Sequence, residues 1–292
     1  MSRQVKNIIN ITAFLICIAL VNIAGQNIEL EIRGVNAFTY ILIAAVLIQV
    51  IFFIPSFLLK TEKYYDLVGS LTYVITISLA YFAVENKTTI DSIIYIYVMI
   101  WASRLGIYLF RRVQKDGKDV RFEKAKTHFF WFLQYWMGQA LWVSLTACAA
   151  IIAILSPEED TLPVLAMLGM ALWLTGFTIE SISDYQKRVF RKENTPSKSF
   201  IHTGLWARSR HPNYFGEITL WTGIAIIALN TLAGIEYITL ISPVFVYILL
   251  TRMSGVNLLE RIADERYGEL EEYQRYKKNT PVLIPKLSKD KN

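Results

Sequence analysis

The long apolar segments of this chain constrain its fold more than any other feature of the sequence. The chain has 292 residues, of which 54% are hydrophobic. A helix needs about 17–25 predominantly apolar residues to cross the hydrocarbon core of a bilayer. The candidate spans are Ile8–Ala24, Asn36–Leu59, Leu67–Val84, Ile90–Phe110, Phe129–Leu155, Leu162–Ile179, Phe215–Asn230 and Ile235–Thr251. The sequence therefore predicts an all-α fold, a polytopic integral membrane helical bundle of seven to eight transmembrane helices.

The charged residues between these segments predict the orientation of the chain in the membrane. Basic residues gather in residues 60–63, 111–126 and 187–210 and after Thr251, whereas residues 26–31 and 156–160 are acidic. Loops that are rich in Lys and Arg stay in the cytoplasm. Eight spans with both termini in the cytoplasm place every basic segment on that side, so we expect this topology.

Several functional classes are excluded by what the sequence lacks. Its three histidines and two cysteines show no metal-ligand spacing, and both cysteines lie in apolar runs, so no metal site is expected. A soluble dinucleotide-binding fold is excluded because there is no Gly-x-Gly-x-x-Gly motif and no alternation of strands and helices. The net charge of +6 comes from segments that border the spans, so membrane lipid is an expected partner and nucleic acid is not. We expect one integral-membrane domain over residues 1–292, present as a monomer.

The most informative polar stretch is Gly204–Glu217, directly before an apolar segment. Ionisable groups at membrane depth are costly unless they bind a ligand or take part in chemistry. A basic surface loop would explain the arginines, but not the polar residues that continue into the apolar segment. The arginines and the histidine suit an anionic ligand, and the asparagine and glutamate suit a ribose or a heterocycle. The polar residues concerned are Arg208, Arg210, His211, Asn213, Tyr214 and Glu217.

A second polar cluster precedes this stretch, and we expect it on the same cytoplasmic face. Glu180, Asp184, Arg188 and Arg191 follow one another at intervals of four, four and three residues, so they share one face of a helix. Exposed salt links would explain them and would be worth only about 0.3–0.5 kcal/mol each. If the face points into the bundle, the aspartate can accept from ribose or amide groups, and the arginines can bind phosphates.

Two further clusters complete the predicted site. After Met253 we expect one cytoplasmic helix, which ends before Pro281 and carries Glu260 and Tyr273. Such a helix could cap the site, although an amphipathic helix at the membrane surface would explain most of its residues equally well. The last cluster comprises Tyr64–Asp66 at the start of the third span and Arg104 inside the fourth, where snorkelling of the long side chain is the alternative.

The C-terminal motifs, taken together, resemble those of a known family. They are Glu180…Asp184-Tyr185-Gln186-Lys187…Phe190-Arg191, Gly204-Leu205-Trp206…Ser209-Arg210-His211-Pro212-Asn213-Tyr214-Phe215-Gly216-Glu217, Tyr273 and Leu283-Ile284-Pro285. This combination resembles the steroid 5α-reductase family, and its bacterial branch in particular. The resemblance makes residues 176–285 the cofactor-binding C-terminal half and residues 1–35 an extra N-terminal span relative to the animal enzymes.

The resemblance implies an integral membrane reductase that uses NADPH. In that family, hydride passes to the enone C=C of a 3-oxo-Δ4 steroid, or here a similar apolar lipid, to give the saturated 5α-ketone. The substrate would enter from the bilayer, and the cytoplasmic connecting loops would form the cofactor site. The expected location is the bacterial inner membrane.

The resemblance also assigns roles to particular residues. Asp66 matches the position of the family's catalytic glutamate, with a side chain one methylene shorter. Trp101 stands where the family has its catalytic tyrosine, so Tyr97 or Tyr65 is expected to supply the hydroxyl. From the clusters and the resemblance together, the cofactor-binding candidates are Arg104, Arg121, Glu180, Asp184, Arg188, Arg191, Arg208, Arg210, His211, Asn213, Tyr214, Glu217, Glu260 and Tyr273.

Two other classes of function stay open at this point. The Arg210–Pro212 element also resembles isoprenylcysteine and phospholipid methyltransferases, which bind S-adenosylmethionine there. That cofactor carries a positive charge, so the predicted cluster of arginines would repel it. A non-enzymatic lipid-binding or transport protein would show broken helices or polar residues across the bilayer. Because the polar residues gather at one face, the NADPH-dependent reductase is our leading hypothesis.

Overall fold

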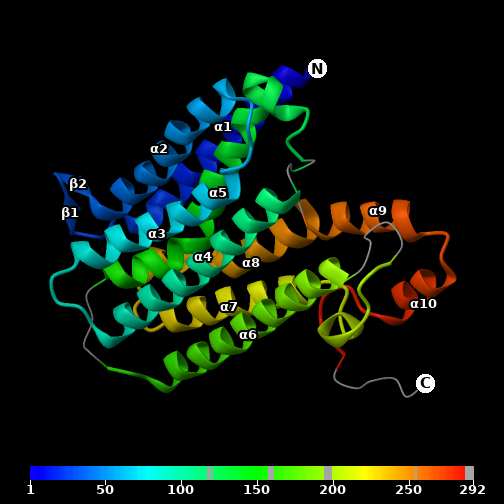
Figure 1. Ribbon diagram of the computed structural model, residues 1–292. Helices are drawn as coiled ribbons and strands as arrows, with labels where there is room; N and C mark the ends of the chain where they lie inside the picture. The colour runs from blue at the N-terminus through cyan, green and yellow to red at the C-terminus, as the bar shows by residue number, and fades with distance from the viewer. Residues whose placement is uncertain (117–118, 120, 157–160, 194–198, 254, 287–292) are drawn as a thin grey trace. The chain divides into compact units, whose positions relative to one another are not determined.

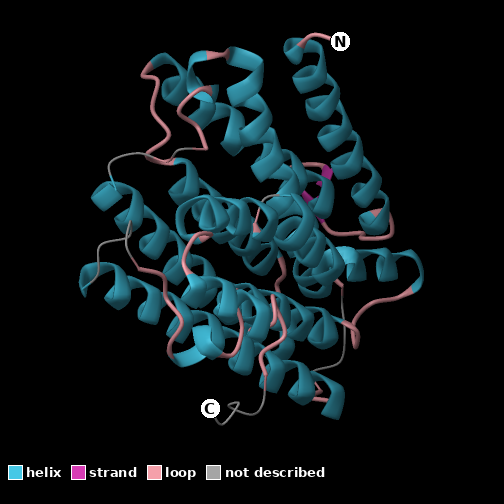
Figure 2. Cartoon of the chain, turned by 90° about the vertical axis from the view of Figure 1, so that its right-hand side faces the viewer, coloured by secondary structure: helices cyan, strands magenta, loops and turns pink. Residues whose placement is uncertain are grey.

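In the computed structural model, the chain folds almost entirely into helices, as Figures 1 and 2 show. The structure describes residues 1–116, 119, 121–156, 161–193, 199–253 and 255–286. Its contacts divide it into two compact units, which are Met1–Ala166 with Ala225–Ser242 and Met167–Ile224 with Pro243–Asn292. The predicted all-α fold is confirmed. The expectation of a single domain over the whole chain stays a prediction.

The first unit is a bundle built around one central helix. Within it, α5 packs against α1, α2 and α3, and α3 packs against α2 and α4. Most of α5 is buried, because its alanines let neighbouring helices approach its backbone closely. The elements are α1 (Arg3–Asn22), η1 (Ile23–Gly25), α2 (Ala37–Leu58), α3 (Tyr65–Ala83), α4 (Thr89–Asp116), η2 (Ala125–Thr127), α5 (Phe129–Leu155) and η4 (Gly234–Leu240).

Local sequence signals set where these helices begin. The Asn36 side chain accepts a hydrogen bond from the Thr39 N–H at 3.1 Å and so caps α2. At the start of α4, the Asp91 carboxylate accepts from the Thr88 N–H at 2.8 Å. The Thr88 hydroxyl in turn accepts from the Asp91 N–H at 3.1 Å. This reciprocal pair satisfies two backbone donors, so α4 starts where the polar residues precede the apolar run.

A small hairpin joins η1 to α2, which the sequence analysis did not predict. Strands β1 (Glu31–Ile32) and β2 (Val35–Asn36) pair antiparallel around a two-residue turn. Both turn residues have positive φ, 54° at Arg33 and 78° at Gly34, as a type I′ hairpin turn requires. With only two residues in each strand, the hairpin leaves no period-2 pattern in the sequence that would reveal it.

The second unit contains the helices that carry most of the predicted site. They are α6 (Val164–Glu193, within this unit from Met167 on), η3 (Gly204–Ala207), α7 (Pro212–Ala228, within this unit up to Ile224), α8 (Ile241–Ile248, within this unit from Pro243 on), the π-helical η5 (Leu249–Met253), α9 (Val256–Tyr267) and α10 (Glu271–Asn279). The prediction of one helix after Met253 is wrong, because α9 ends at Tyr267 with Gly268 as its C-cap, and α10 starts at Glu271. Glycine lowers helix stability and favours such an end. The predicted span that ended at Ile179 continues to Glu193, so the acidic and basic cluster lies on the same helix as the apolar run.

Seven helical segments of the described chain are long and apolar enough to cross a membrane. Helix α7, which corresponds to the predicted span Phe215–Asn230, has 17 residues and is shorter than these. The predicted total of seven to eight spans is thus confirmed by length and composition. The orientation stays a prediction, and Pro157–Asp160 of its acidic loop lie outside the described residues.

Candidate functional site

Helices α6 and α7 cross at a point where glycines allow their backbones to touch. A Cβ atom at Gly176 would lie 2.5 Å from the Gly216 carbonyl oxygen, and one at Gly216 would lie 2.6 Å from the Glu180 nitrogen. Two helical turns after Gly216 on α7, a Cβ at Gly223 would lie 2.7 Å from the nitrogen of Trp173 on α6. The sequence therefore needs glycine at this crossing, and the crossing brings the two polar motifs of this unit against each other.

This close contact buries three of the predicted cofactor-binding acids. Glu180 and Asp184 of α6 are 2% and 5% exposed, and Glu217 of α7 is 6% exposed. Their burial agrees with a helix face that points into the protein, and it excludes the alternative of solvent-exposed salt links for the two acids of α6. None of the three lines the pocket of the same unit that is described next.

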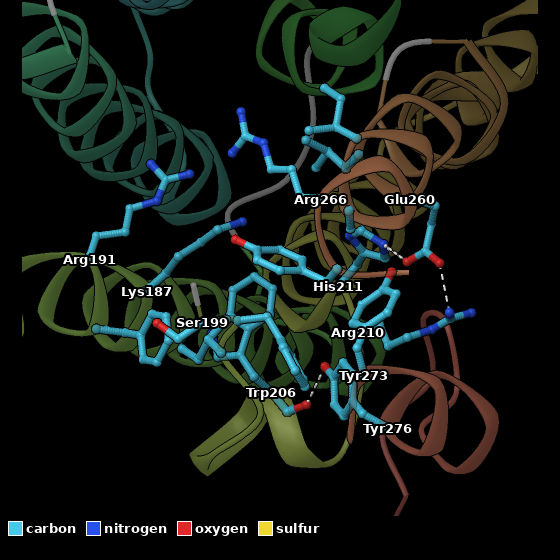
Figure 3. A pocket seen from close by; sticks show the side chains of 17 residues that line it. Lys187, Arg191, Ser199, Trp206, Arg210, His211, Glu260, Arg266, Tyr273 and Tyr276 are labelled. Atoms are coloured by element: carbon cyan, nitrogen blue, oxygen red, sulfur yellow. Dashed lines mark hydrogen bonds and ion pairs between the residues drawn. The ribbon is translucent and has the colours of Figure 1, made fainter. Parts of the chain in front are cut away.

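A pocket opens between α6, α9, α10 and residues 199–211 (Figure 3). Lys187 and Arg191 of α6 and Arg266 of α9 extend their charged groups toward the same side of it. Glu260 is the one carboxylate among the described residues that line the pocket, and it is already paired, as shown below. Three cations that share one cavity repel one another, so the pocket favours an anionic ligand.

Aromatic rings form much of the wall of the pocket. The ring of Phe200 lies 5.2 Å from that of Tyr273 and 5.3 Å from that of Tyr276, centroid to centroid. Trp206 adds an indole ring, over which the Lys187 ammonium lies at 4.5 Å. A planar heterocycle can stack on such a wall. The lining Phe, Trp and Tyr rings are Phe190, Phe200, Trp206, Tyr267, Tyr273 and Tyr276.

At one end of the pocket, Glu260 accepts hydrogen bonds from two neighbouring residues of the Arg-His-Pro element. Arg210 Nη1 lies 2.6 Å from Glu260 Oε2, and His211 Nε2 lies 2.8 Å from Glu260 Oε1. The histidine is 5% exposed. Burial lowers the pKa of the His211 imidazole below its ordinary value, although the bond to Glu260 opposes this shift. The ring is therefore neutral at pH 7, with its proton on the nitrogen that faces the carboxylate.

The C-terminal segment holds this element in place by backbone pairing. The Arg210 N–H donates to the Pro281 carbonyl at 2.9 Å, and the His211 N–H donates to the Val282 carbonyl at 3.1 Å. The buried Ser209 hydroxyl donates to the Leu283 carbonyl at 2.7 Å. These bonds explain why the residues after Pro281 run alongside the start of α7. They also restrict where the Arg210 and His211 side chains can lie.

Two tyrosines of α10 tie the aromatic wall to the rest of the unit. The Tyr276 hydroxyl donates to the Trp206 carbonyl at 2.8 Å, and the Tyr273 hydroxyl donates to Asp264 Oδ1 at 3.1 Å. Burial raises the pKa of both phenols above their ordinary value, and the bond to Asp264 raises that of Tyr273 further. Both hydroxyls are therefore protonated donors over the physiological pH range.

The lowered pKa of His211 predicts a loss of stability in mild acid. Between the unfolded value of about 6.5 and the lower folded value, the unfolded chain binds a proton that the folded chain does not. The free energy of unfolding should therefore fall as the pH drops below about 6.5. The charged groups that act on the ring are those of Glu260, Lys187 and Arg210. Thermal unfolding in detergent across this pH range should show a steeper decline for the wild type than for His211→Gln, and parallel curves would contradict the prediction.

The structure brings five of the predicted cofactor-binding residues together at the pocket and leaves others elsewhere in the same unit. Arg188 is exposed, with its guanidinium 5.3 Å from the centre of the Tyr185 ring. The Arg208 carbonyl accepts from the Lys286 N–H at 3.0 Å, and the Tyr214 ring stacks parallel to His211 at 5.5 Å. Asn213 lies in the first turn of α7 and is half-buried. The residues at the pocket are Arg191, Arg210, His211, Glu260 and Tyr273.

Several pocket residues were not among the predicted site residues. Tyr276 follows Tyr273 by three positions, and Tyr267 follows Glu260 by seven, so helical spacing could have identified both from the residues that were selected. Lys187 and Arg266 belong to clusters of charged residues on exposed helix ends. Lys187 lies within the quoted family motif, whereas the sequence carries no signal that separates Arg266 from ordinary surface charges.

The predicted catalytic residues belong to the first unit, where they take part in packing and ion pairs. The Tyr65 hydroxyl donates to the Tyr135 carbonyl at 2.9 Å, and its ring packs against Phe122 and Trp136. Asp66 lies 3.4 Å from a guanidinium nitrogen of Arg112 and 3.4 Å from one of Arg121. Both guanidinium groups donate to the carboxylate, so each of its two oxygens is already engaged as an acceptor.

The ion pairs of Asp66 extend into a network around the start of α3. Arg121 donates from Nε and Nη2 to Asp119, with a shortest distance of 2.7 Å. Burial lowers the pKa of Arg121, but its bonds to Asp119 and the charge of Asp66 outweigh this and raise it. Burial raises the pKa of Asp119, but the bonds from Arg121 outweigh this and lower it. The Glu62 carboxylate accepts from Lys126 at 2.7 Å and from the Asp119 N–H at 3.1 Å. The guanidinium of Arg121 is thus already engaged, and a phosphate would have to compete with two carboxylates for it.

The remaining candidates of this unit lie along α4. Tyr97 and Arg104 are both half-buried, and Trp101 between them is buried against Tyr73, ring centroids 5.0 Å apart. The indole at position 101 therefore serves as a packing residue. The catalytic roles of Tyr65, Asp66 and Tyr97 and the cofactor role of Arg104 stay predictions.

Comparison with known proteins relates the chain to one family and to a set of animal enzymes. The family described as "Protein of unknown function (DUF1295)" matches residues 52–280. The 3-oxo-5-alpha-steroid 4-dehydrogenase 1 of Mus musculus is 31% identical over 121 residues, which are 41% of this chain and 42% of that relative. The protein of the same name from Homo sapiens is 27% identical over 121 residues, 41% of each chain.

These matches confirm the predicted resemblance to the steroid 5α-reductase family. The chain spans about two-fifths of the length of the curated relatives that it matches. No solved structure matches it.

Proposed function

We propose, from the premise that this chain belongs to the family described as "Protein of unknown function (DUF1295)", that it is a membrane-embedded NADPH-dependent reductase. The relatives that bear the name 3-oxo-5-alpha-steroid 4-dehydrogenase suggest an oxidoreductase. The substrate that we propose is the enone of a 3-oxo-Δ4 steroid or a similar apolar lipid, and the product is the saturated 5α-ketone.

The observation that carries this proposal is the pocket of the second unit. Lys187, Arg191 and Arg266 offer three positive charges on one side, and the aromatic wall offers a surface for a planar base. A phosphorylated dinucleotide needs both, because its phosphates carry the charge and its bases are flat. S-adenosylmethionine has no phosphate, and it carries a positive charge. The same pocket therefore disfavours it.

Bound NADPH would supply the hydride, and the protein would have to stabilise the negative charge that develops on the substrate oxygen. Such charge needs a preorganised donor in a dry cavity. Tyr97, Tyr65 and Asp66 are our candidates for this role. The apolar helices that surround them would admit a lipid substrate from the bilayer.

We place the protein in the bacterial inner membrane as a monomer with both termini in the cytoplasm. Seven helical segments of the described chain that are long and apolar enough to span a membrane support an integral membrane protein. The basic segments on either side of the pocket helices support a cytoplasmic cofactor site, because NADPH is a cytoplasmic metabolite and Lys-rich and Arg-rich segments stay on that side.

The proposal is tested by titrating detergent-purified protein with NADPH and, in parallel, with S-adenosylmethionine. We expect saturable binding of NADPH that S-adenosylmethionine does not displace. Turnover of a 3-oxo-Δ4 steroid with NADPH consumption would then define the reaction. Binding of S-adenosylmethionine without binding of NADPH would replace the reductase with a methyltransferase.

The substitution Asp66→Asn separates a catalytic role of this carboxylate from a structural one. If Asp66 acts on the substrate oxygen, turnover should fall by at least about tenfold while the NADPH dissociation constant stays unchanged. If it acts only through Arg112 and Arg121, the melting temperature should fall and the turnover of the folded enzyme should not. Measuring kcat, the dissociation constant and thermal unfolding on the same preparation distinguishes the two outcomes.

A further inference from the structure

The second nitrogen of the His211 ring has no hydrogen-bond partner in the part of the chain that the structure describes. Nδ1 is buried, while Nε2 bonds to Glu260. A buried acceptor that is left unpaired is costly. His211 lines the pocket, so a bound molecule is in a position to supply the missing donor.

Two contacts, together with burial, prepare this nitrogen to accept a hydrogen bond. The protonated Nε2 donates to the Glu260 carboxylate, so Nδ1 is the ring nitrogen that has a lone pair to accept with. Burial lowers the pKa of the ring, so it stays neutral at pH 7 despite the nearby carboxylate. The Val282 carbonyl holds the His211 backbone at 3.1 Å, so the ring is presented from a restrained position. An acceptor whose position and tautomer are both set can discriminate between ligands.

The surroundings of the ring indicate which end of a dinucleotide would reach it. The adenosine end of NADPH carries the 2′-phosphate as well as the pyrophosphate, whereas the nicotinamide end carries only the pyrophosphate. Three cations and an aromatic wall within one pocket therefore fit the adenosine end better. The exocyclic amino group of adenine is an N–H donor at the edge of a planar base.

We propose that His211 Nδ1 accepts a hydrogen bond from the adenine amino group of the cofactor, with Glu260 as the residue that sets its tautomer. This inference rests on the proposed function. In this arrangement His211 selects for adenine, whereas the cations of the pocket select for phosphate.

The test compares NADPH with its hypoxanthine analogue, in which a carbonyl replaces the amino group. Titration calorimetry on the purified full-length protein measures both dissociation constants. We expect the analogue to bind about tenfold more weakly to the wild type, because its carbonyl meets an acceptor and leaves it unpaired. The 3-acetylpyridine analogue, which alters only the nicotinamide carboxamide, should bind as NADPH does.

Two substitutions at the same position serve as a matched pair. In His211→Gln the amide nitrogen can still donate to Glu260, but no acceptor remains near Nδ1, so the preference for NADPH over the hypoxanthine analogue should fall to about one. In His211→Asn the amide oxygen can replace Nδ1 while the bond to Glu260 is lost. Both ligands should then bind more weakly, with the preference retained.

Each contrary outcome has a distinct meaning. Equal binding of NADPH and the hypoxanthine analogue to the wild type overturns the inference and leaves the proposed reductase intact. Weaker binding of the acetylpyridine analogue alone also overturns it, because the carboxamide would then be the group at His211. A wild-type protein that binds no NADPH overturns the proposed function and the inference together.

Discussion

Replacing Arg191 with alanine should weaken NADPH binding by about 10- to 100-fold, which corresponds to about 1.5–3 kcal/mol for a charge-assisted hydrogen bond. Arg191 lines the pocket from α6, and its guanidinium extends toward the same region as the Lys187 ammonium and the Arg266 guanidinium. Its removal takes away one of three charges and one bidentate donor. Calorimetric titration of the purified variant measures the change directly.

Lys192→Ala is the matched control for this substitution. Lys192 is the next residue on α6, is exposed, carries the same charge, and is absent from the described lining of the pocket. Its replacement should change the affinity by less than about twofold, because exposed charges outside a site are screened by salt. An Arg191→Ala variant that binds NADPH as tightly as the wild type would remove the phosphate contact from the proposal.

Gly216→Ala should destabilise the second unit by at least about 1–3 kcal/mol, the usual cost of overpacking. The new methyl group would lie 2.6 Å from the Glu180 nitrogen and 2.6 Å from the Gly176 oxygen. Both are backbone atoms, so the helices must separate to make room. The melting temperature should fall, and so should the affinity for NADPH, because α6 carries Lys187 and Arg191 while the start of α7 adjoins His211.

Gly138→Ala provides the comparison for the helix-propensity effect. At this position of α5 a Cβ would meet only a Phe14 ring carbon at 3.5 Å, which is ordinary contact. Since alanine is favoured over glycine in a helix by about 1 kcal/mol, this variant should be as stable as the wild type or more so. If Gly216→Ala were equally harmless, the close contact of α6 with α7 would not contribute to stability.

Part of the candidate site could be predicted from the sequence because it lies in short, dense polar motifs. Arg210 and His211 stand out before an apolar run, and Arg191 and Glu260 stand out on helices of mixed character. What the sequence could not show is that Glu260 pairs with both residues of the Arg-His motif from about fifty positions away. Nor could it show that Arg121 and Asp66 bond to each other, because each was selected for a separate role.

The helical fold and the approximate limits of its spans follow from the sequence alone, because the length of an apolar run and the bilayer thickness are local quantities. Where the predicted helix limits differ from the structure, the cause is also local. Helix α6 continues past its apolar part, and Gly268 separates α9 from α10. The tertiary structure alone decided which polar groups are exposed, paired or left with a free acceptor. Glycines at the crossing of α6 and α7 and backbone bonds from residues 281–283 set those distances, and contacts between residues far apart in the chain leave no periodic signal in it.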